Sequence, residues 1–152
     1  MKYLLVVDLQ KEFVKDKKGE KVYKDCLDYI LAEGRNYDAV LAAVYVNNRN
    51  PNMHRLLQWE GCKKIEQLEF IPDAAYYHSG YSIKEYPKVH ASDTIDIIGL
   101  DTDACVLSAC FHVFDLGCNM NILTKYIWSS GGKKMHDAGI AIMKRQFGIA
   151  VK

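Results

Sequence analysis

The sequence predicts a three-layer α/β domain, in which helices cover both faces of a mostly parallel sheet. The chain alternates short apolar runs with longer segments of helical period, which is typical of βαβ units. Its 152 residues are enough for one hydrophobic core and too few for two ordinary domains. Because 49% of the residues are hydrophobic and only three are proline, we expect residues 1–152 to form one domain without a disordered tail.

Six short apolar runs are the predicted strands. The first is continuously apolar and ends at Asp8, as expected for a strand that is buried on both faces. Right-handed crossovers would arrange such strands as a doubly wound sheet, which binds ligands at the carboxyl ends of its strands. The predicted strands are residues 3–8, 39–46, 74–78, 94–99, 120–124 and a short last strand at 149–151.

Apolar residues at helical spacing predict the connecting helices. In the segment 22–34, Cys26 and Ile30 share one face, and Gly34 ends the helix. The stretch 47–52 is rich in asparagine and contains Pro51, so we expect a loop there. The predicted helices are residues 22–34, 53–59, 82–89, 103–117 and 133–147.

The charge balance argues against nucleic-acid and membrane partners. Lys and Arg (20) nearly equal Asp and Glu (19), so no net field would attract phosphate backbones or anionic lipids. The apolar run at residues 1–7 stops at Asp8, which makes it too short for the apolar part of a secretion signal. The five cysteines are odd in number and form no CxxC pair. We therefore expect reduced thiols and a cytoplasmic protein.

Asp8 and Cys105 are the candidate chemical groups at the predicted crevice. Asp8 ends the first strand, where partial burial would raise its pKa and suit it to proton transfer. Alternatively, it caps the following turn. Cys105 lies just inside a predicted helix, whose N-terminal amides and dipole favour the thiolate. The other four cysteines are interpreted as small buried hydrophobic residues.

Two segments resemble the motifs of isochorismatase-like cysteine hydrolases, a superfamily that includes nicotinamidases and N-carbamoylsarcosine amidohydrolases. Residues 6–13 (VVDLQKEF) are similar to the opening motif, and residues 99–106 (GLDTDACV) are similar to the nucleophile motif. The resemblance extends through residues 80–82, 129–132 and 136–146, and so covers nearly the whole chain.

The resemblance implies a Rossmann-like six-stranded sheet and hydrolysis of an amide or related C–N bond in a small molecule. It makes Cys105 the nucleophile, through a thioester intermediate, and Asp8 the general base. It also implies a cis peptide bond between Leu100 and Asp101. The backbone amides of Asp101 and Cys105 would form the oxyanion hole.

The sequence departs from the family pattern at the third catalytic residue, because the family lysine falls at His78. A protonated imidazole could stabilise the thiolate and orient Asp8. Lys125, which follows the predicted fifth strand, is a possible substitute cation; the alternative is a solvated surface lysine. Lys84 is a further candidate of the same kind.

The resemblance also bears on the pocket and on metals. Phe13, Trp59 and Tyr81 fall in segments that line the substrate pocket in the family, where aromatic walls suit a flat or small apolar ligand. Nicotinamidases add an Asp and paired histidines for a metal, but the matching loop here offers only His54. We therefore predict no metal and no cofactor.

The sequence thus predicts a cysteine-dependent amidohydrolase with a small-molecule substrate. The alternative is a catalytically degenerate member that binds a small ligand or a protein partner without turnover, because His78 replaces the lysine. A flavodoxin-like nucleotide or redox module would share the sheet, but the sequence has no Gly-rich phosphate loop. The resemblance also implies a homo-oligomer, a dimer or larger, in which the last helix could join the interface.

Overall fold

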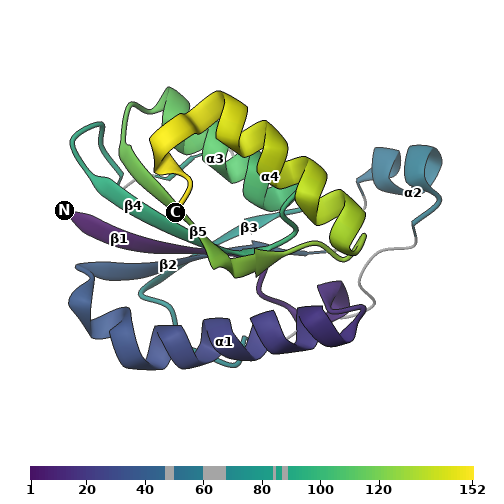
Figure 1. Cartoon of the computed structure of the whole chain (residues 1–152), viewed down its shortest axis with the longest axis horizontal. Coiled ribbons are helices and arrows are strands. Elements are labelled where there is room, and N and C mark those ends of the chain that lie inside the picture. Colours follow the sequence, from purple (N-terminus) through teal and green to yellow (C-terminus); the bar gives the residue numbers. More distant parts are fainter. Residues whose placement is uncertain (47–49, 60–67, 84, 87–88) are drawn as a thin grey trace.

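The chain forms an α/β structure around a parallel sheet, as predicted. The computed structural model describes all residues except 47–49, 60–67, 84 and 87–88. Within the described part, five parallel strands lie in the order β3-β2-β1-β4-β5 (Figure 1). The strands are β1 (Lys2–Val7), β2 (Ala39–Tyr45), β3 (Ala74–His78), β4 (Thr94–Leu100) and β5 (Asn119–Trp128).

Helices cover both faces of this sheet. Figure 1 shows α1 on one side, α3 and α4 on the other, and α2 beyond the end of the strands. The helices are α1 (Lys17–Glu33), α2 (Pro51–Leu57), α3 (Cys105–Asp115) and α4 (Lys133–Phe147), with 3-10 turns η1 (Lys11–Phe13), η2 (Gly34–Asn36) and η3 (Gly148–Ala150). Among the described residues, no helix has both the length and the apolar character that a bilayer crossing requires.

The central strand β1 supplies both halves of the core. Its side chains alternate between the faces, so that Leu5 and Val7 pack in the cluster beneath α3 and α4. Leu4 and Val6 pack in the second cluster, against α1. All four side chains are buried, which explains why the strand reads as a continuous apolar run. Asp8 follows directly, at the carboxyl end of this buried strand.

Two predicted elements are wrong. The sixth strand is reduced to one parallel bridge between Ile122 and Val151, because η3 occupies the residues before it. The segment 82–89 is not helical in its described residues. Its apolar residues recur every third position, and Ile83, Tyr86 and Val89 are buried in the core beneath α3 and α4 without forming a helix.

The boundaries of one helix and one strand also differ from the prediction. Helix α1 begins at Lys17 and not at residue 22, since the Asp16 side chain caps it by accepting a hydrogen bond from the Gly19 amide at 2.6 Å. Strand β5 continues to Trp128, past the predicted end at residue 124, with an irregular register between Ile97 and Gly99 of its neighbour β4.

Gly99 allows β4 to lie close beside β1. Its φ is +128°, and a Cβ atom there would sit 2.0 Å from the backbone oxygen of Val7. Only glycine combines this backbone conformation with that approach. The close contact matters for the site because Val7 precedes Asp8, and Gly99 lies next to Leu100, after which β4 ends and the loop to Cys105 begins.

We expect Gly99→Ala to lower the free energy of unfolding by about 3 kcal/mol or more, because its methyl group collides with backbone that cannot move aside. Urea denaturation of the variant and of a Gly34→Ala control tests this. Gly34 has ordinary helical backbone, and a Cβ there would lie 3.5 Å from Val40, so the control should change stability by less than about 1 kcal/mol. Equal stability of the two variants would contradict the interpretation.

Candidate active site

Asp8 is placed by a sharp turn at the end of β1. Its φ is +44°, a left-handed conformation that aspartate tolerates better than most residues. The amide of Asp8 still donates to the carbonyl of Ala43 on β2, at 2.9 Å. The chain then turns away, and the carboxylate is completely buried at the carboxyl edge of the sheet.

Gln10 fixes this turn to the neighbouring strand. Its side-chain Nε2 donates to the Tyr45 carbonyl at 3.0 Å, and its Oε1 accepts from the Tyr45 amide at 2.9 Å. Gln10 is itself buried, so these two bonds satisfy all four polar groups away from solvent. The side-chain amide thus pairs with the end of β2 and holds the chain that follows Asp8.

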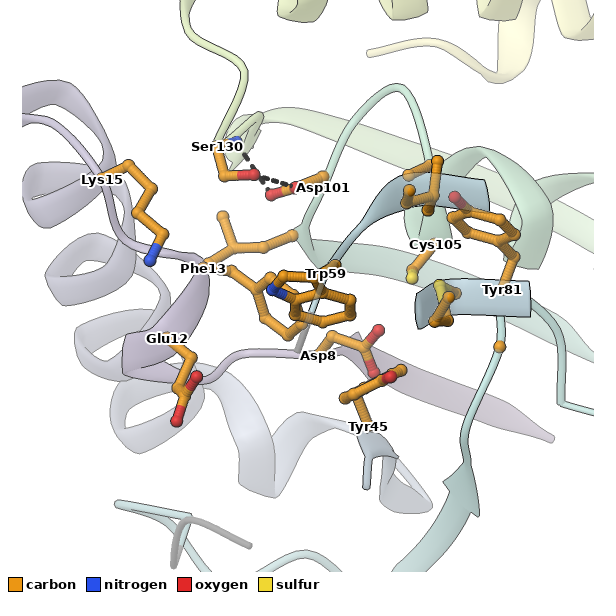
Figure 2. A pocket seen from close by; sticks show the side chains of 15 residues that line it. Asp8, Glu12, Phe13, Lys15, Tyr45, Trp59, Tyr81, Asp101, Cys105 and Ser130 are labelled. Atoms are coloured by element: carbon orange, nitrogen blue, oxygen red, sulfur yellow. Dashed lines mark hydrogen bonds between the residues drawn. The ribbon is translucent and has the colours of Figure 1, made fainter. Parts of the chain in front are cut away.

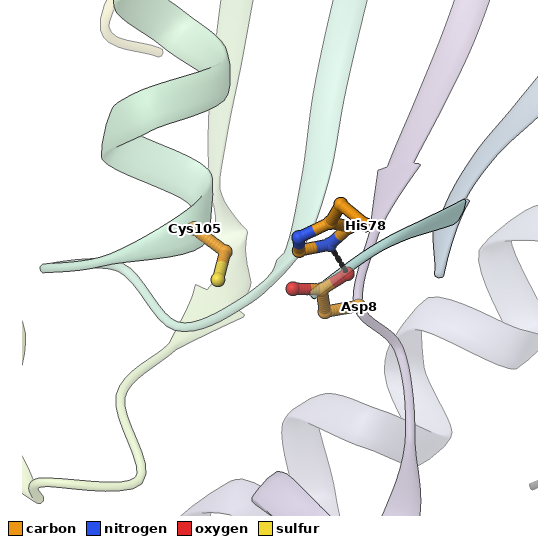
Figure 3. A group of neighbouring side chains, drawn as sticks. All are labelled: Asp8, His78 and Cys105. Atoms are coloured by element: carbon orange, nitrogen blue, oxygen red, sulfur yellow. Dashed lines mark hydrogen bonds and ion pairs between the residues drawn. The ribbon is translucent and has the colours of Figure 1, made fainter. Parts of the chain in front are cut away.

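His78 ends β3 and reaches the carboxylate of Asp8 (Figure 3). Its Nδ1 lies 2.8 Å from the Gly80 carbonyl oxygen, which can only accept a hydrogen bond, so Nδ1 carries a proton. Its Nε2 lies 2.6 Å from Oδ1 of Asp8, at hydrogen-bond distance from a second acceptor. An imidazole flanked by two acceptors is best satisfied when both of its nitrogens are protonated.

The electrostatics of His78 agree with this geometry. Burial lowers its pKa, but the hydrogen bond and the charge of Asp8, with the Gly80 carbonyl, outweigh burial and leave the pKa of His78 raised. The edge of the His78 ring also packs against Tyr45, with ring centres 5.6 Å apart. His78 and Asp8 therefore form a buried ion pair with a restricted ring orientation.

Cys105 is the first residue of α3 and completes the cluster. Its Sγ, a carboxylate oxygen of Asp8 and a ring nitrogen of His78 all lie within 4.8 Å of one another. Oδ2 of Asp8 is buried and has no hydrogen-bond partner among the described residues, and Figure 3 shows it pointing toward Cys105. The structure thus brings together Asp8, His78 and Cys105 from three separate segments.

The expectation of a helix-stabilised thiolate is wrong for the site at rest. Burial and then the negative charge of Asp8 raise the pKa of the Cys105 thiol well above its usual range. Cys105 is therefore a thiol that needs a base to lose its proton, and Asp8 is the adjacent base.

The loop before Cys105 contains a cis peptide bond between Leu100 and Asp101, at the position that the family resemblance implied. Hydrogen bonds join this loop to the end of β5 and to α4. The amide of Thr102 donates to the Trp128 carbonyl at 3.0 Å, and its hydroxyl is hydrogen-bonded to Nδ1 of His136 at 2.8 Å. The backbone that carries Asp101 and Cys105 is thus held on two sides.

The Asp101 side chain is a polar group that the sequence analysis missed. Its carboxylate accepts hydrogen bonds from the Ser130 amide at 2.9 Å and from the Ser130 hydroxyl. Burial raises the pKa of Asp101 to about 6, although Ser130 opposes the shift. The side chain of Asp101 lines the same cavity as Asp8 and Cys105 (Figure 2).

A cavity of about 230 Å³ opens above Asp8 and Cys105. The three predicted pocket residues Phe13, Trp59 and Tyr81 all line it (Figure 2). The volume is slightly below the range of about 300–1,000 Å³ for drug-sized ligands, so it suits a smaller molecule. Leu100 and Asp101, which were predicted for the cis peptide bond and the oxyanion hole, also line the cavity. The lining residues that were not predicted from the sequence are Glu12, Lys15, Tyr45, Met53, Leu57, Gly80, Ala104 and Ser130.

Three aromatic rings form one wall of the cavity. The ring centres of Phe13 and Tyr45 lie 5.9 Å apart, and those of Tyr45 and Trp59 lie 5.2 Å apart. Tyr45 connects this wall to the cluster of Asp8, His78 and Cys105, because it also contacts His78. The position of Tyr45 at the carboxyl end of β2 was the signal that could have identified it as a cavity residue.

Lys125, the substitute cation predicted from the sequence, does not lie in the site. Because β5 continues to Trp128, Lys125 sits within the strand and not at its end, with an exposed side chain. Its Nζ lies 5.1 Å from the centre of the Tyr126 ring, and it does not line the cavity. The Lys125 prediction is therefore wrong, and Lys84 lies outside the described residues. His54 is exposed on α2.

The fold is one that solved structures of amidases and isochorismatase-like hydrolases share. Nicotinamidase/pyrazinamidase from Streptococcus mutans aligns over 100% of both chains, with a TM-score of 0.77 and 15% identity. N-carbamoylsarcosine amidase from Thermoplasma acidophilum aligns over 99% of this chain and 95% of its own, with a TM-score of 0.77 and 18% identity. An isochorismatase-like hydrolase from Alkaliphilus metalliredigens aligns over 95% of this chain and 90% of its own, with a TM-score of 0.70 and 18% identity. No protein-family model and no curated protein matches the sequence.

We expect Gln10→Ala to lower the free energy of unfolding by about 2 kcal/mol or more, because it removes the two hydrogen bonds that the Gln10 side chain makes with the amide and the carbonyl of Tyr45 in the protein interior. Lys11→Ala is the matched control: it removes an exposed ammonium that pairs with Glu69 on the surface, and this change should alter stability by about 1 kcal/mol or less. Urea denaturation measures both, and a Gln10 variant no less stable than the control would contradict this role.

Proposed function

We propose that this protein is a cysteine hydrolase that cleaves an amide or related C–N bond in a small molecule. One observation carries the proposal: Oδ2 of buried Asp8, which no other described residue engages, faces the thiol of Cys105 at the base of an open cavity. A base next to a nucleophile, with a third group orienting the base, is the arrangement that nucleophilic catalysis requires. The shared fold of the amidases supports the choice of bond.

In the proposed mechanism, Oδ2 of Asp8 takes the proton of the Cys105 thiol as the sulfur attacks the carbonyl carbon. The tetrahedral oxyanion is stabilised by the backbone amides of Asp101 and Cys105. Asp8 returns the proton to the departing nitrogen, and a thioester remains on Cys105. Asp8 then activates a water molecule, which hydrolyses the thioester, releases the acid and restores the thiol.

His78 takes the role of orienting Asp8. Its Nε2 holds Oδ1 at 2.6 Å, which leaves Oδ2 directed at the thiol. Its charge occupies the place that the family resemblance assigns to lysine, and it stabilises the carboxylate while the proton moves. Since His78 lies beneath the cavity and does not line it, we assign it a positioning role.

The cavity suggests a small, flat substrate. The aromatic wall of Phe13, Tyr45 and Trp59 can stack on a planar group, and the volume leaves room for little more than one ring. Glu12 and Lys15 line the same cavity and could select polar substituents. We propose small carboxamides and ureas as the substrate class, and neither nucleic acid nor a membrane as a partner.

The competing proposal is a degenerate member that binds a ligand or a protein partner without turnover. The raised pKa of the Cys105 thiol favours this degenerate alternative, because a protonated sulfur is a poor nucleophile. The unpartnered base beside that thiol favours the enzyme. Turnover distinguishes the two.

We expect the protein to release ammonia from at least one member of a panel of small amides and ureas, and intact-protein mass spectrometry to detect an acyl adduct on Cys105. Cys105→Ala should lower kcat/KM at least about 1,000-fold, because it removes the nucleophile. Cys110→Ala is the control, since Cys110 is a buried thiol of the same helix that does not line the cavity.

Equal rates in Cys105→Ala and the wild type would disprove the cysteine mechanism. A protein that binds members of the panel, yet neither turns over nor forms an adduct, would support the degenerate alternative.

We further propose a cytoplasmic homo-oligomer. Of the described cysteines, Cys26, Cys105, Cys110 and Cys118 are free, which suits a reducing compartment. Phe111 and Phe114 project from α3 with 40% and 55% of their surface exposed and pack on Phe147 of α4. An exposed aromatic cluster of this kind is typical of an interface.

We expect light scattering to give at least twice the mass of one chain, and Phe114→Glu to convert the protein to a monomer, because a charge at the interface core is costly to bury. Leu31→Glu is the control: Leu31 is 79% exposed on α1, across the sheet from α3. A wild-type monomer, or dissociation by Leu31→Glu and not by Phe114→Glu, would refute this interface.

A further inference from the structure

We propose that Asp8, His78 and Cys105 form a binding site for one zinc ion, and that the bound ion masks the thiol of Cys105. These residues supply a carboxylate oxygen, an imidazole nitrogen and a sulfur, which are the three kinds of protein ligand that zinc takes. Binding requires only the geometry of the cluster, so it does not depend on the hydrolase function.

The spacing of the three donors fits one ion. Zinc lies about 2.0–2.3 Å from each ligand, so the donors around a tetrahedral ion lie about 3.3–3.8 Å from one another. Here the three donor atoms are already within 4.8 Å of one another, and all three residues are buried. Small side-chain rotations therefore suffice. The cavity lined by Asp8 and Cys105 gives an ion its entry path and a water as fourth ligand.

An incomplete polar environment also indicates a missing partner. Apart from the thiol of Cys105, which it faces, Oδ2 of Asp8 has no hydrogen-bond partner among the described residues, although a buried carboxylate oxygen normally accepts more than one hydrogen bond. It points toward Sγ of Cys105, so a cation between them would neutralise both groups (Figure 3).

The surroundings of His78 match those of a zinc ligand. A metal-binding histidine usually donates its other ring N–H to a carbonyl or carboxylate, which fixes the ring. In this structure Nδ1 of His78 donates to the Gly80 carbonyl and leaves Nε2 directed into the cluster. The edge contact with Tyr45 restrains the ring further.

The site arises from the residue at position 78. A lysine there, as the family resemblance implies, would place a protonated ammonium beside Asp8 and repel a metal ion. Histidine provides a ligand atom instead. No metal was predicted from the sequence because His54 is the only histidine that the matching loop offers, whereas these three ligands come from segments that are distant in the chain.

Binding exchanges protons for the ion without any redox change. The thiol of Cys105 and Nε2 of His78 each lose a proton to solvent, and their electron pairs bind the metal with one oxygen of Asp8. Since the sulfur is then coordinated, it cannot attack a carbonyl. If the proposed hydrolase function holds, zinc is a reversible inhibitor of it.

The test is titration of chelator-treated protein with cobalt and then zinc. We expect one equivalent of cobalt to give the near-ultraviolet absorption of a thiolate–cobalt bond, and one equivalent of zinc to abolish it. Zinc should also slow alkylation of Cys105 at least about tenfold, as followed by peptide mass spectrometry, and a chelator should restore the rate.

Variants assign the ligands. His78→Lys should weaken zinc binding at least about 100-fold, because even loss of an outer partner of a ligand costs about 10–100-fold. Cys105→Ser should lose the thiolate absorption. Cys118→Ser is the control, because Cys118 is the more exposed thiol and should retain full binding. Circular dichroism checks that each variant is folded, and His78→Gln replaces His78→Lys if that protein is unfolded.

Absence of saturable binding, cobalt absorption without a thiolate contribution, or unchanged zinc affinity in a folded His78 variant would each overturn the proposal. The two functions fail separately. If chelator-treated protein hydrolyses amides but binds no zinc, only the metal site is refuted. Protein that binds zinc through the three residues, but shows no turnover after chelation, would refute only the hydrolase.

Discussion

The carboxylate of Asp8 is completely enclosed by protein, and its charge has to be balanced within the site. A buried charge is tolerated only when it is paired and hydrogen-bonded, because its desolvation costs several kcal/mol. His78 supplies that pairing through Oδ1, while Oδ2 is left facing Cys105. The site therefore depends on an asymmetric carboxylate, with one oxygen committed to orientation and the other available for a proton or a cation.

The sheet topology creates this asymmetry. The strand order β3-β2-β1-β4-β5 places the change in winding direction between β1 and β4, where doubly wound sheets open a crevice at their carboxyl ends. Asp8 leaves β1 on one side of the crevice, and the loop after β4 delivers Cys105 on the other. His78 reaches Asp8 from the edge strand β3, past the end of β2. Gln10 and Gly99 make this convergence possible, since one pairs with Tyr45 and the other lets β4 approach Val7.

The sequence predicts the parts of this arrangement that follow from strand ends. Asp8 directly follows a predicted strand and His78 ends another, whereas Cys105 begins the helix after the predicted fourth strand, and parallel topology places these strand ends at one edge of the sheet. The cavity wall could not be predicted in the same way, because the directions of Tyr45 and Asp101 depend on the turn at Asp8 and on the loop after Leu100. The Lys125 prediction was wrong because an irregular register extends β5, which periodicity does not reveal. The prediction of a helix over residues 82–89 was wrong because burial of every third residue does not require a helix.

The need for a positive partner at Asp8 also links stability to chemistry. Neutral replacements of His78 leave the carboxylate buried and unpaired, so they should cost folding free energy as well as function. An imidazolium, an ammonium or a metal ion can each satisfy the carboxylate, but they differ in what they leave for Cys105. The imidazolium and the ammonium leave the thiol beside a free base, whereas the metal takes the sulfur for itself. Histidine is the residue that permits both states, because the same Nε2 either holds a proton against Oδ1 or releases it to bind a cation.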